Sequence, residues 1–152
     1  MLEPCERSLR KRQTRAPKFY LFDPGVVRAL SRTLTVELPP HTYAYGRAFE
    51  HFVILEMVRL SANRQNDFRF AYLRTKDGVE VDLIVERPGL PAALVEIKST
   101  TRVDDRDVRQ LVRIRKDLPR CEALCLSQDP IAKKLNGVSA LPWLEGISEL
   151  GL

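Results

Sequence analysis

Two spacings of hydrophobic residues divide the chain into elements. Residues 46–62 carry apolar side chains at helical spacing and predict a long helix, and residues 103–118 repeat that pattern. Between these helices, period-two alternation and apolar runs predict three consecutive strands, at 68–74, 79–87 and 92–98. Residues 122–127 predict a fourth strand. The order α-β-β-β-α-β is typical of an α/β domain with a mixed central sheet flanked by helices.

Turn and capping residues mark the flanking elements. Asp23 followed by Pro24 predicts the start of a helix directly after a short strand. The Asp77-Gly78 pair predicts a tight hairpin turn between the first two strands of the sheet. Residues 129–137 predict a short helix ending at Gly137, and residues 141–150 a terminal helical segment.

The second hairpin fixes which residues face one another. If it turns about Gly89, Asp82 lies opposite Glu96, and Glu80 lies opposite Lys98, where those two could form a salt bridge. All four charged side chains are then expected on one face of the sheet. The other face is expected to collect the apolar residues Val79, Val81, Leu83, Val85, Ala93, Val95 and Ile97, joined by Phe68, Phe70 and Tyr72.

Two carboxylates facing each other across a sheet require compensation. Like charges in that position destabilise the sheet unless one is protonated, water surrounds them, or a cation lies between them. Hard ions such as Mg²⁺ take oxygen ligands from one or two carboxylates, which makes Asp82 and Glu96 candidate metal ligands. Lys98 could orient or deprotonate an attacking water, or stabilise developing negative charge. Glu50 shares a helical stripe with apolar residues and is expected to face the sheet edge.

Composition narrows the protein class. The 152 residues suffice for one domain, 30% of them are charged, and the longest apolar runs fall short of a membrane span. The basic N-terminus lacks the apolar stretch of a secretion signal, and the three cysteines include no CxxC pair, so we expect a cytoplasmic protein. Residues 1–16 are expected to be a basic tail or linker, and residues 17–152 the folded domain.

The net charge of +5 favours an anionic partner. One set of basic residues recurs at helical spacing along residues 103–118 and just before them, where it could follow phosphates or simply form a solvated helix face. Its members are Arg102, Arg106, Arg109 and Arg113.

The acid on one strand and Glu-x-Lys on the next resemble the PD-(D/E)XK nuclease signature. Asp82 matches the aspartate, Glu96 and Lys98 match the second half, and Glu50 matches the helix glutamate. Val81 stands where many members have a proline. The resemblance implies a restriction-endonuclease-like fold with the same α-β-β-β-α-β core.

A closer resemblance covers most of the chain. Five blocks, in family order, are similar to the domain of unknown function 4143: residues 16–30, 46–60, 72–86, 94–100 and 141–145. That domain usually follows an AAA-type ATPase module and a winged helix. No Walker A loop occurs in this chain, so the resemblance implies that the ATPase and winged-helix modules are partners absent from it.

The resemblance implies metal-dependent hydrolysis of DNA phosphodiesters. Asp82, Glu96 and the backbone carbonyl of Ile97 would hold Mg²⁺ or Mn²⁺, Lys98 would act on the attacking water, and Glu50 would hold a second metal or a metal-bound water. The arginines and a glutamine would contact phosphates without reading sequence, through Arg102, Arg106, Arg109, Gln110 and Arg113.

An alternative from another class is a catalytically silent nucleic-acid-binding or oligomerisation module that docks on an ATPase. Trp143, in the apolar C-terminal segment, could serve such docking or pack on the core. Zinc hydrolysis has little support, because His41 and His51 form no HExxH arrangement. The form of the nucleic acid and the oligomeric state, a homodimer included, stay open.

Overall fold

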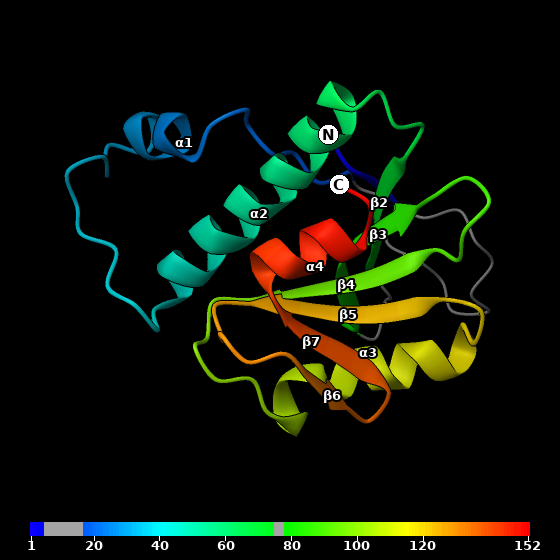
Figure 1. Cartoon of the computed structure of the whole chain (residues 1–152). Helices are drawn as coiled ribbons and strands as arrows, with labels where there is room; N and C mark the ends of the chain where they lie inside the picture. The colour runs from blue at the N-terminus through cyan, green and yellow to red at the C-terminus, as the bar shows by residue number, and fades with distance from the viewer. Residues whose placement is uncertain (5–16, 75–77) are drawn as a thin grey trace.

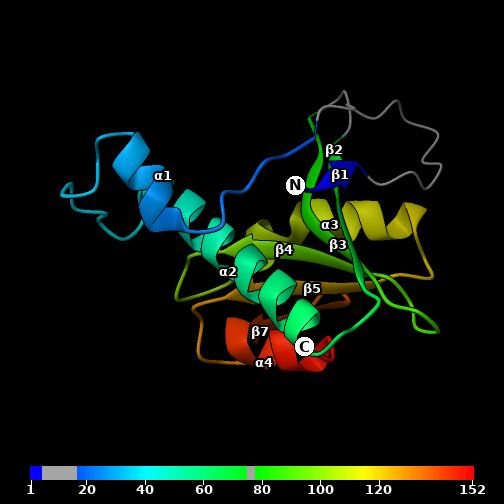
Figure 2. The same cartoon turned by 90° about the horizontal axis from the view of Figure 1, so that it is seen from above.

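Three layers make up the protein, as seen in a computed structural model that describes residues 1–4, 17–74 and 78–152. Helices α2 and α4 cover one face of a central sheet, and α3 covers the other (Figure 1, Figure 2). In the described residues the sheet has seven strands in the order β1-β2-β3-β4-β5-β7-β6. The elements are β1 (Glu3–Pro4), α1 (Pro24–Leu30), α2 (Tyr43–Asn63), β2 (Arg69–Arg74), β3 (Glu80–Glu86), β4 (Ala93–Lys98), α3 (Asp105–Asp117), β5 (Glu122–Ser127), β6 (Lys133–Leu135), β7 (Val138–Pro142) and α4 (Trp143–Glu149).

The sheet is mixed. Strands β2, β3 and β4 are antiparallel, whereas β4, β5 and β7 are parallel to one another. The predicted order of two helices and four strands, from α2 to β5, and the mixed α/β class are confirmed. None of the helices in the described ranges has the length and apolar content needed to cross a bilayer.

The helix starts follow from local capping. The side chain of Asp23 accepts the N–H of Gly25 at 2.6 Å, and Pro24 occupies the first helical position of α1, as predicted. Asp104 caps α3, and Asp107 closes a reciprocal capping box with it. The two acids lie at the positive end of the α3 dipole, which further stabilises that terminus.

Two hydrophobic clusters lie on the two faces of the sheet. On the α2 side, Phe49, Val53, Ile54 and Met57 pack against the strands and against α4. On the opposite side, three residues of α3 fill the second cluster: Val108, Leu111 and Ile114. Because both faces are covered, β4 and β5 are apolar along most of their length, as is usual for strands in such sheets.

The prediction of a helix over 129–137 is wrong. Residues 133–135 form β6, which pairs with β7 through Leu135 and Val138. The two residues between them, Asn136 and Gly137, have φ of 49° and 85°, as the tightest hairpin turns require. The predicted strand before Asp23 is also absent from the described residues, where Lys18 makes only an isolated bridge with Leu2.

The N-terminal segment joins the sheet where the structure describes it. Leu2 is buried in the cluster beneath α2, and β1 pairs with β2. Most of the predicted basic tail, residues 5–16, lies outside the described residues, as does Asp77 of the predicted hairpin turn.

A β-bulge in β3 changes which face its side chains occupy. Ala71 pairs with Ile84 and Leu73 with Val81, so that Tyr72 alone lies opposite two residues, Asp82 and Leu83. Tyr72 and Leu83 pack in the cluster beneath α2, whereas Val81 packs on the α3 side. The prediction of one continuous apolar face is therefore wrong for Val81, and also for Val79, which packs against the α3-side cluster.

The bulge also separates the charged side chains that were expected on one face. In β4, Val95 and Ile97 pack beneath α2, so Glu96 and Lys98 alternate toward the α3 side. Asp82 lies in the bulge opposite Tyr72 and is turned toward α2. The prediction of a single charged face is wrong, because one extra residue in β3 shifts the alternation.

Candidate metal and active site

The candidate site lies where β3 and β4 separate. The two strands pair through Leu83 and Val95, the register predicted from a turn at Gly89. One step further, that register places Asp82 opposite Glu96, as predicted, but the paired residues have ended there. These two acids therefore flank an opening in the sheet.

Asp82 closes the gap with its side chain. Its Oδ2 accepts the backbone N–H of Ile97 at 2.8 Å, in place of a backbone carbonyl of β3. The N–H and C=O of one strand residue point to the same side, so the Ile97 carbonyl is also directed toward β3. The opening is thus lined by a carboxylate and a backbone carbonyl, both oxygen donors.

Asp82 is half-buried, and the contacts that favour its charged form are few. Burial raises the pKa of its carboxyl well above the ordinary range, and the nearby charges of Glu96 and Glu50 raise it further. The Ile97 N–H and Lys98 act in the opposite direction without reversing the shift. A cation at this position would offset the elevation, because it would stabilise the charged carboxylate.

Glu96 and Lys98 form an ion pair on the neighbouring strand. Lys98 Nζ lies 2.7 Å from Glu96 Oε1, while Glu96 Oε2 is buried and has no hydrogen-bond partner among the residues that the structure describes. Burial raises the pKa of Glu96 despite the lowering effect of Lys98. Burial lowers the pKa of Lys98, but Glu96 and Asp82 raise it more, so the side chain is a stable ammonium.

Glu80 is not the partner of Lys98. Its carboxylate pairs instead with Lys18, and Arg74 Nε lies 3.8 Å from its second oxygen. The predicted alternative of a Glu80–Lys98 salt bridge is therefore wrong, because the bulge turns the two residues to different faces.

Glu50 projects from α2 toward the same opening. The hydroxyl of Tyr20 donates to Glu50 Oε1 at 2.8 Å, and Arg47 Nη1 lies 3.9 Å from the other oxygen. Burial raises the pKa of Tyr20, as do Glu50 and, more weakly, Asp82. The expectation that Glu50 faces the sheet and acquires a partner agrees with this geometry, but the partner itself was not predicted.

An extended segment, residues 17–22, contacts two of the acids and is called the strap below. It precedes the α-β-β-β-α-β core in the sequence. Lys18 binds Glu80, and its ammonium lies 5.2 Å from the centre of the Tyr72 ring. The backbone of the strap is fixed to α2, because His51 Nε2 lies 2.7 Å from the Leu21 carbonyl. One weak signal in the sequence could have indicated these contacts. Lys18 and Tyr20 are two residues apart, so an extended backbone directs both side chains toward one side.

The donor set fits a hard divalent ion. All candidate donors are oxygens, one of them is buried without a partner, and two carboxyls have raised pKa values. Within the described residues, no three His, Cys, Asp or Glu side chains lie close enough to hold a metal ion as they stand. Each acid is turned to a protein partner: Asp82 to Ile97, Glu96 to Lys98 and Glu50 to Tyr20.

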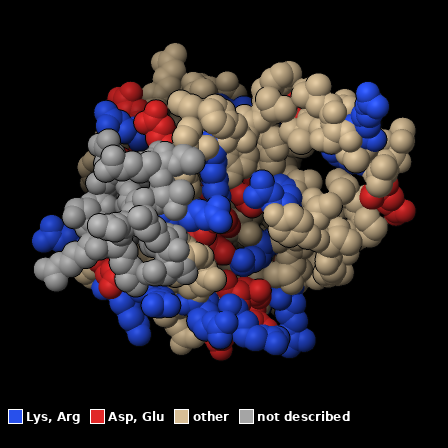
Figure 3. Space-filling model, turned by 180° about the vertical axis from the view of Figure 1, so that it is seen from behind, with Lys and Arg blue, Asp and Glu red and all other residues tan. Residues whose placement is uncertain are grey.

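The predicted phosphate contacts are exposed, as a binding role requires. Arg102, Arg106, Arg109, Gln110 and Arg113 are all on the surface. Lys and Arg side chains gather along the lower edge of the molecule, where α3 lies, interleaved with acids (Figure 3).

Distance along α3 separates these residues. Because α3 begins just beyond the end of β4, Arg102 and Arg106 are nearest the site, and Arg113 lies about 10 Å further along the helix. Arg106 already pairs with the capping Asp104, at 2.7 Å. The structure thus places Asp82 within electrostatic reach of Glu96, Glu50 and Lys98, with each acid on a protein partner, and it spreads the arginines along α3.

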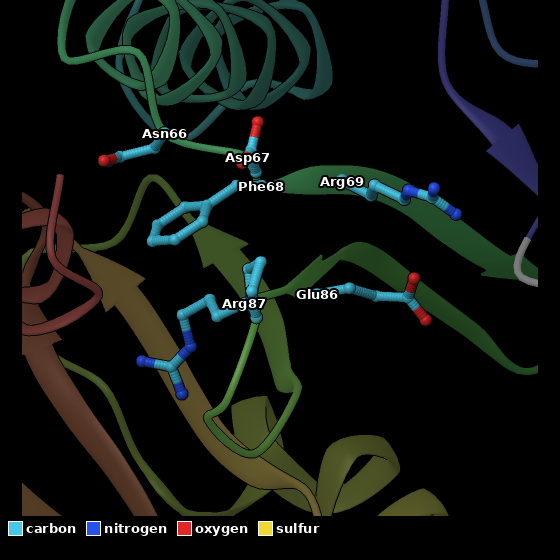
Figure 4. A pocket seen from close by; sticks show the side chains of 7 residues that line it. Asn66, Asp67, Phe68, Arg69, Glu86 and Arg87 are labelled. Atoms are coloured by element: carbon cyan, nitrogen blue, oxygen red, sulfur yellow. The ribbon is translucent and has the colours of Figure 1, made fainter.

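A second hollow, of about 720 Å³, lies at the other end of the β2–β3 hairpin. Arg69 and Glu86 are cross-strand partners there, and their side chains point the same way, while Phe68 and Arg87 point to the opposite side (Figure 4). The Arg87 guanidinium donates to the Pro91 carbonyl and to Glu122. Arg87 thus has a structural role, and the hollow shows no converging donors among its described lining residues.

Comparison with known proteins identifies the family. Residues 45–144 match the domain of unknown function DUF4143. The chain belongs to this family. It is 34% identical over 103 residues to the uncharacterized proteins Mb2031c of Mycobacterium bovis and Rv2008c of Mycobacterium tuberculosis, a match that covers 66% of this chain and 22% of each relative. No solved structure gives a significant match. The matched stretch therefore covers only about a fifth of the length of these relatives.

Proposed function

We propose that this DUF4143 domain hydrolyses DNA phosphodiesters with Mg²⁺ or Mn²⁺, through a restriction-endonuclease-like core of the PD-(D/E)XK type. One observation carries the proposal. Where β3 and β4 separate, Glu96 is buried and Asp82 is half-buried, both have raised pKa values, and one Glu96 oxygen has no hydrogen-bond partner among the described residues. A fold that needed these acids only for stability would satisfy them.

Asp82, Glu96 and the Ile97 carbonyl would hold the ion, and Glu50 would hold a second ion or a metal-bound water. When bound, such an ion polarises a phosphate and lowers the pKa of a coordinated water. Binding would require Glu96 to turn from Lys98, which lies 2.7 Å away.

Lys98 serves this reaction as a cation. Without a metal, its ammonium is stabilised by Glu96 and Asp82 and can donate hydrogen bonds and positive charge toward a phosphate. If Glu96 turned away to hold an ion, Lys98 would be free to act on the attacking water or to stabilise the charge that develops on the phosphoryl oxygens. Arg102 and Arg106, at the near end of α3, would bind flanking phosphates independently of sequence.

The test is a nuclease assay on linear, nicked and single-stranded DNA with Mn²⁺, with Lys98→Ala measured beside the unchanged protein. We expect metal-dependent cutting that Lys98→Ala reduces at least about a hundred-fold, as for loss of one transition-state donor. Cutting that survives Lys98→Ala would identify a contaminant and overturn the proposal, as would the absence of cutting with all three substrates.

A second candidate function is supported by one region. The segment around α1 exposes large apolar side chains on its outer side, including Phe22, Leu30, Leu34 and Val36. Such a surface suits docking on a larger protein, and an AAA-type ATPase with a winged helix is the partner that the family resemblance suggests. Trp143 does not supply this surface, because it packs edge-on against Phe49 and Phe52.

A further inference from the structure

A groove of about 480 Å³ lies between the strap, α1 and the first turns of α2. A hollow between the α1 region and the body is visible at the right of Figure 3. Phe19 and Tyr20 of the strap contribute to its wall, as do Tyr43, Arg47 and His51 of α2.

The charge of the groove favours an anion. Its described lining includes Arg28 and Arg47 and contains no Asp or Glu. It also begins at the N-terminal end of α2, where the helix dipole is positive. This positive charge would not stabilise a purely apolar ligand.

Aromatic side chains at the groove are exposed to an unusual degree. Tyr43 is 83% exposed and Phe19 is 76% exposed, although both rings are large enough to gain from burial. Exposed aromatic rings beside positive charge are the combination on which unpaired nucleobases stack.

The groove adjoins the acids. Tyr20 lines it and also donates its hydroxyl to Glu50 at 2.8 Å. Arg47 lines it as well, and its guanidinium lies 3.9 Å from the same carboxylate. A ligand in the groove is therefore separated from the candidate site by one layer of side chains.

We propose that this groove binds a nucleobase of single-stranded DNA, with the adjoining phosphate held by Arg47 and the chain leading on toward Asp82 and Glu96. This deepens the proposed nuclease function and rests on it for the direction of the strand. A base within a duplex is stacked and paired, so entry requires a single strand or a frayed end. The groove thus selects single-stranded over duplex substrate.

The test measures binding without cutting. Fluorescence anisotropy of a labelled oligonucleotide, in EDTA, compares the single strand with a hairpin duplex of the same sequence. We expect tighter binding of the single strand, weakened about ten-fold by Tyr43→Ala. Phe22→Ala, which removes an aromatic ring that is 71% exposed but does not line the groove, is the matched control and should leave binding unchanged.

A single abasic nucleotide sharpens the result. At one position of the strand, the abasic nucleotide should lower the affinity of the unchanged protein as much as Tyr43→Ala does. It should not lower the affinity of the Tyr43→Ala variant any further. Three results would overturn the proposal that the groove binds a base. They are equal affinity for strand and duplex, an abasic effect that adds to that of Tyr43→Ala, and equal effects of Tyr43→Ala and Phe22→Ala. Self-association lost in Tyr43→Ala, with DNA binding intact, would assign the groove to a protein contact and also overturn it.

Cutting in Mn²⁺ separates this inference from the nuclease proposal. If DNA is cut but Tyr43→Ala changes neither the rate nor the strand preference, only the proposal that the groove binds a base is wrong. If the single strand binds through Tyr43 but nothing is cut, the nuclease proposal fails and the groove stands. If neither occurs, both fail.

Discussion

Asp82, which is half-buried, and Asp129, which is buried, each have a lysine nearby, yet their carboxyl groups are in opposite electrostatic environments. Asp129 accepts the N–H groups of Val103 and Ile131 and binds Lys133 at 2.6 Å. These contacts hold the pKa of Asp129 well below its ordinary range, and the hydrogen bond with Lys133 has the largest effect. Asp82 accepts one N–H, and its pKa is raised. Burial alone therefore does not mark a functional acid; burial without adequate partners does.

The largest expected contrast is in the stability of the metal-free protein. Asp129→Asn leaves Lys133 without its counter-charge, so we expect a loss of about 3 kcal/mol in the free energy of unfolding. Asp82→Asn removes a charge that the fold disfavours, so stability should stay equal or rise. Urea unfolding of both variants measures the difference. Equal losses would show that Asp82 is a structural acid like Asp129.

The pH dependence should follow from the same contrast. Because the folded pKa of Asp82 is raised, the folded protein binds more protons than the unfolded chain above about pH 4, and stability falls as pH rises. The contribution is fully present below the unfolded pKa and is lost as pH passes the raised folded value. We expect a fall of about 2 kcal/mol between about pH 5 and pH 8 in EDTA, measured by urea midpoints.

Asp82→Asn should reduce this slope and leave the part that comes from the raised pKa of Glu96. Asp129 does not interfere in that range, because a lowered pKa affects stability only at more acidic pH. A slope that is unchanged in Asp82→Asn would remove this carboxyl as its source.

Mn²⁺ should stabilise the folded protein. At about ten times Kd the gain is about 1.4 kcal/mol, a rise of roughly 3–6 °C in Tm for a domain of this size. Asp82→Asn should abolish most of the shift, since an amide is a poor ligand for a hard cation. Glu80→Gln, on the same strand but paired with Lys18 and Arg74, should retain it. If both variants respond alike, or the unchanged protein shows no shift, these acids bind no metal.

The smallest effect concerns Tyr20, which we expect to position Glu50. Tyr20→Phe keeps the ring, which packs edge-on to His51, and removes the donor to Glu50. The Mn²⁺ stabilisation should drop by about 0.5–1 kcal/mol, the net value of one hydrogen bond. Thermal shifts at several Mn²⁺ concentrations measure this change.

A double-mutant cycle tests whether Tyr20 acts through Glu50. In a Glu50→Gln background, Tyr20→Phe should have no further effect on Mn²⁺ affinity. Tyr45→Phe is the control, because Tyr45 lies on α2 like Glu50 but its hydroxyl is bound to Gln128. This variant should leave the Mn²⁺ shift intact. An effect of Tyr20→Phe that persists without Glu50 would show that the hydroxyl acts by another route.

The sequence by itself determined the elements whose signals are local. Periodicity predicted α2, α3 and the central strands, and Asp23 with Pro24 predicted the start of α1. The turn at Gly89 set the register that places Asp82 opposite Glu96. The β6–β7 hairpin was also predictable, because Asn136-Gly137 is a strong turn signal; the prediction of a helix over that stretch overlooked it.

Only the tertiary structure decided how the site is completed. The bulge in β3 inserts one residue without changing residue composition, so period-two reasoning assigned Val81 to the wrong face. The contacts of Lys18 with Glu80 and Tyr20 with Glu50 join residues 62 and 30 positions apart. No local pattern encodes such pairs, because their partners are chosen by how the strap packs across the sheet and α2. Local propensities therefore placed the acids, and long-range packing decided what holds them.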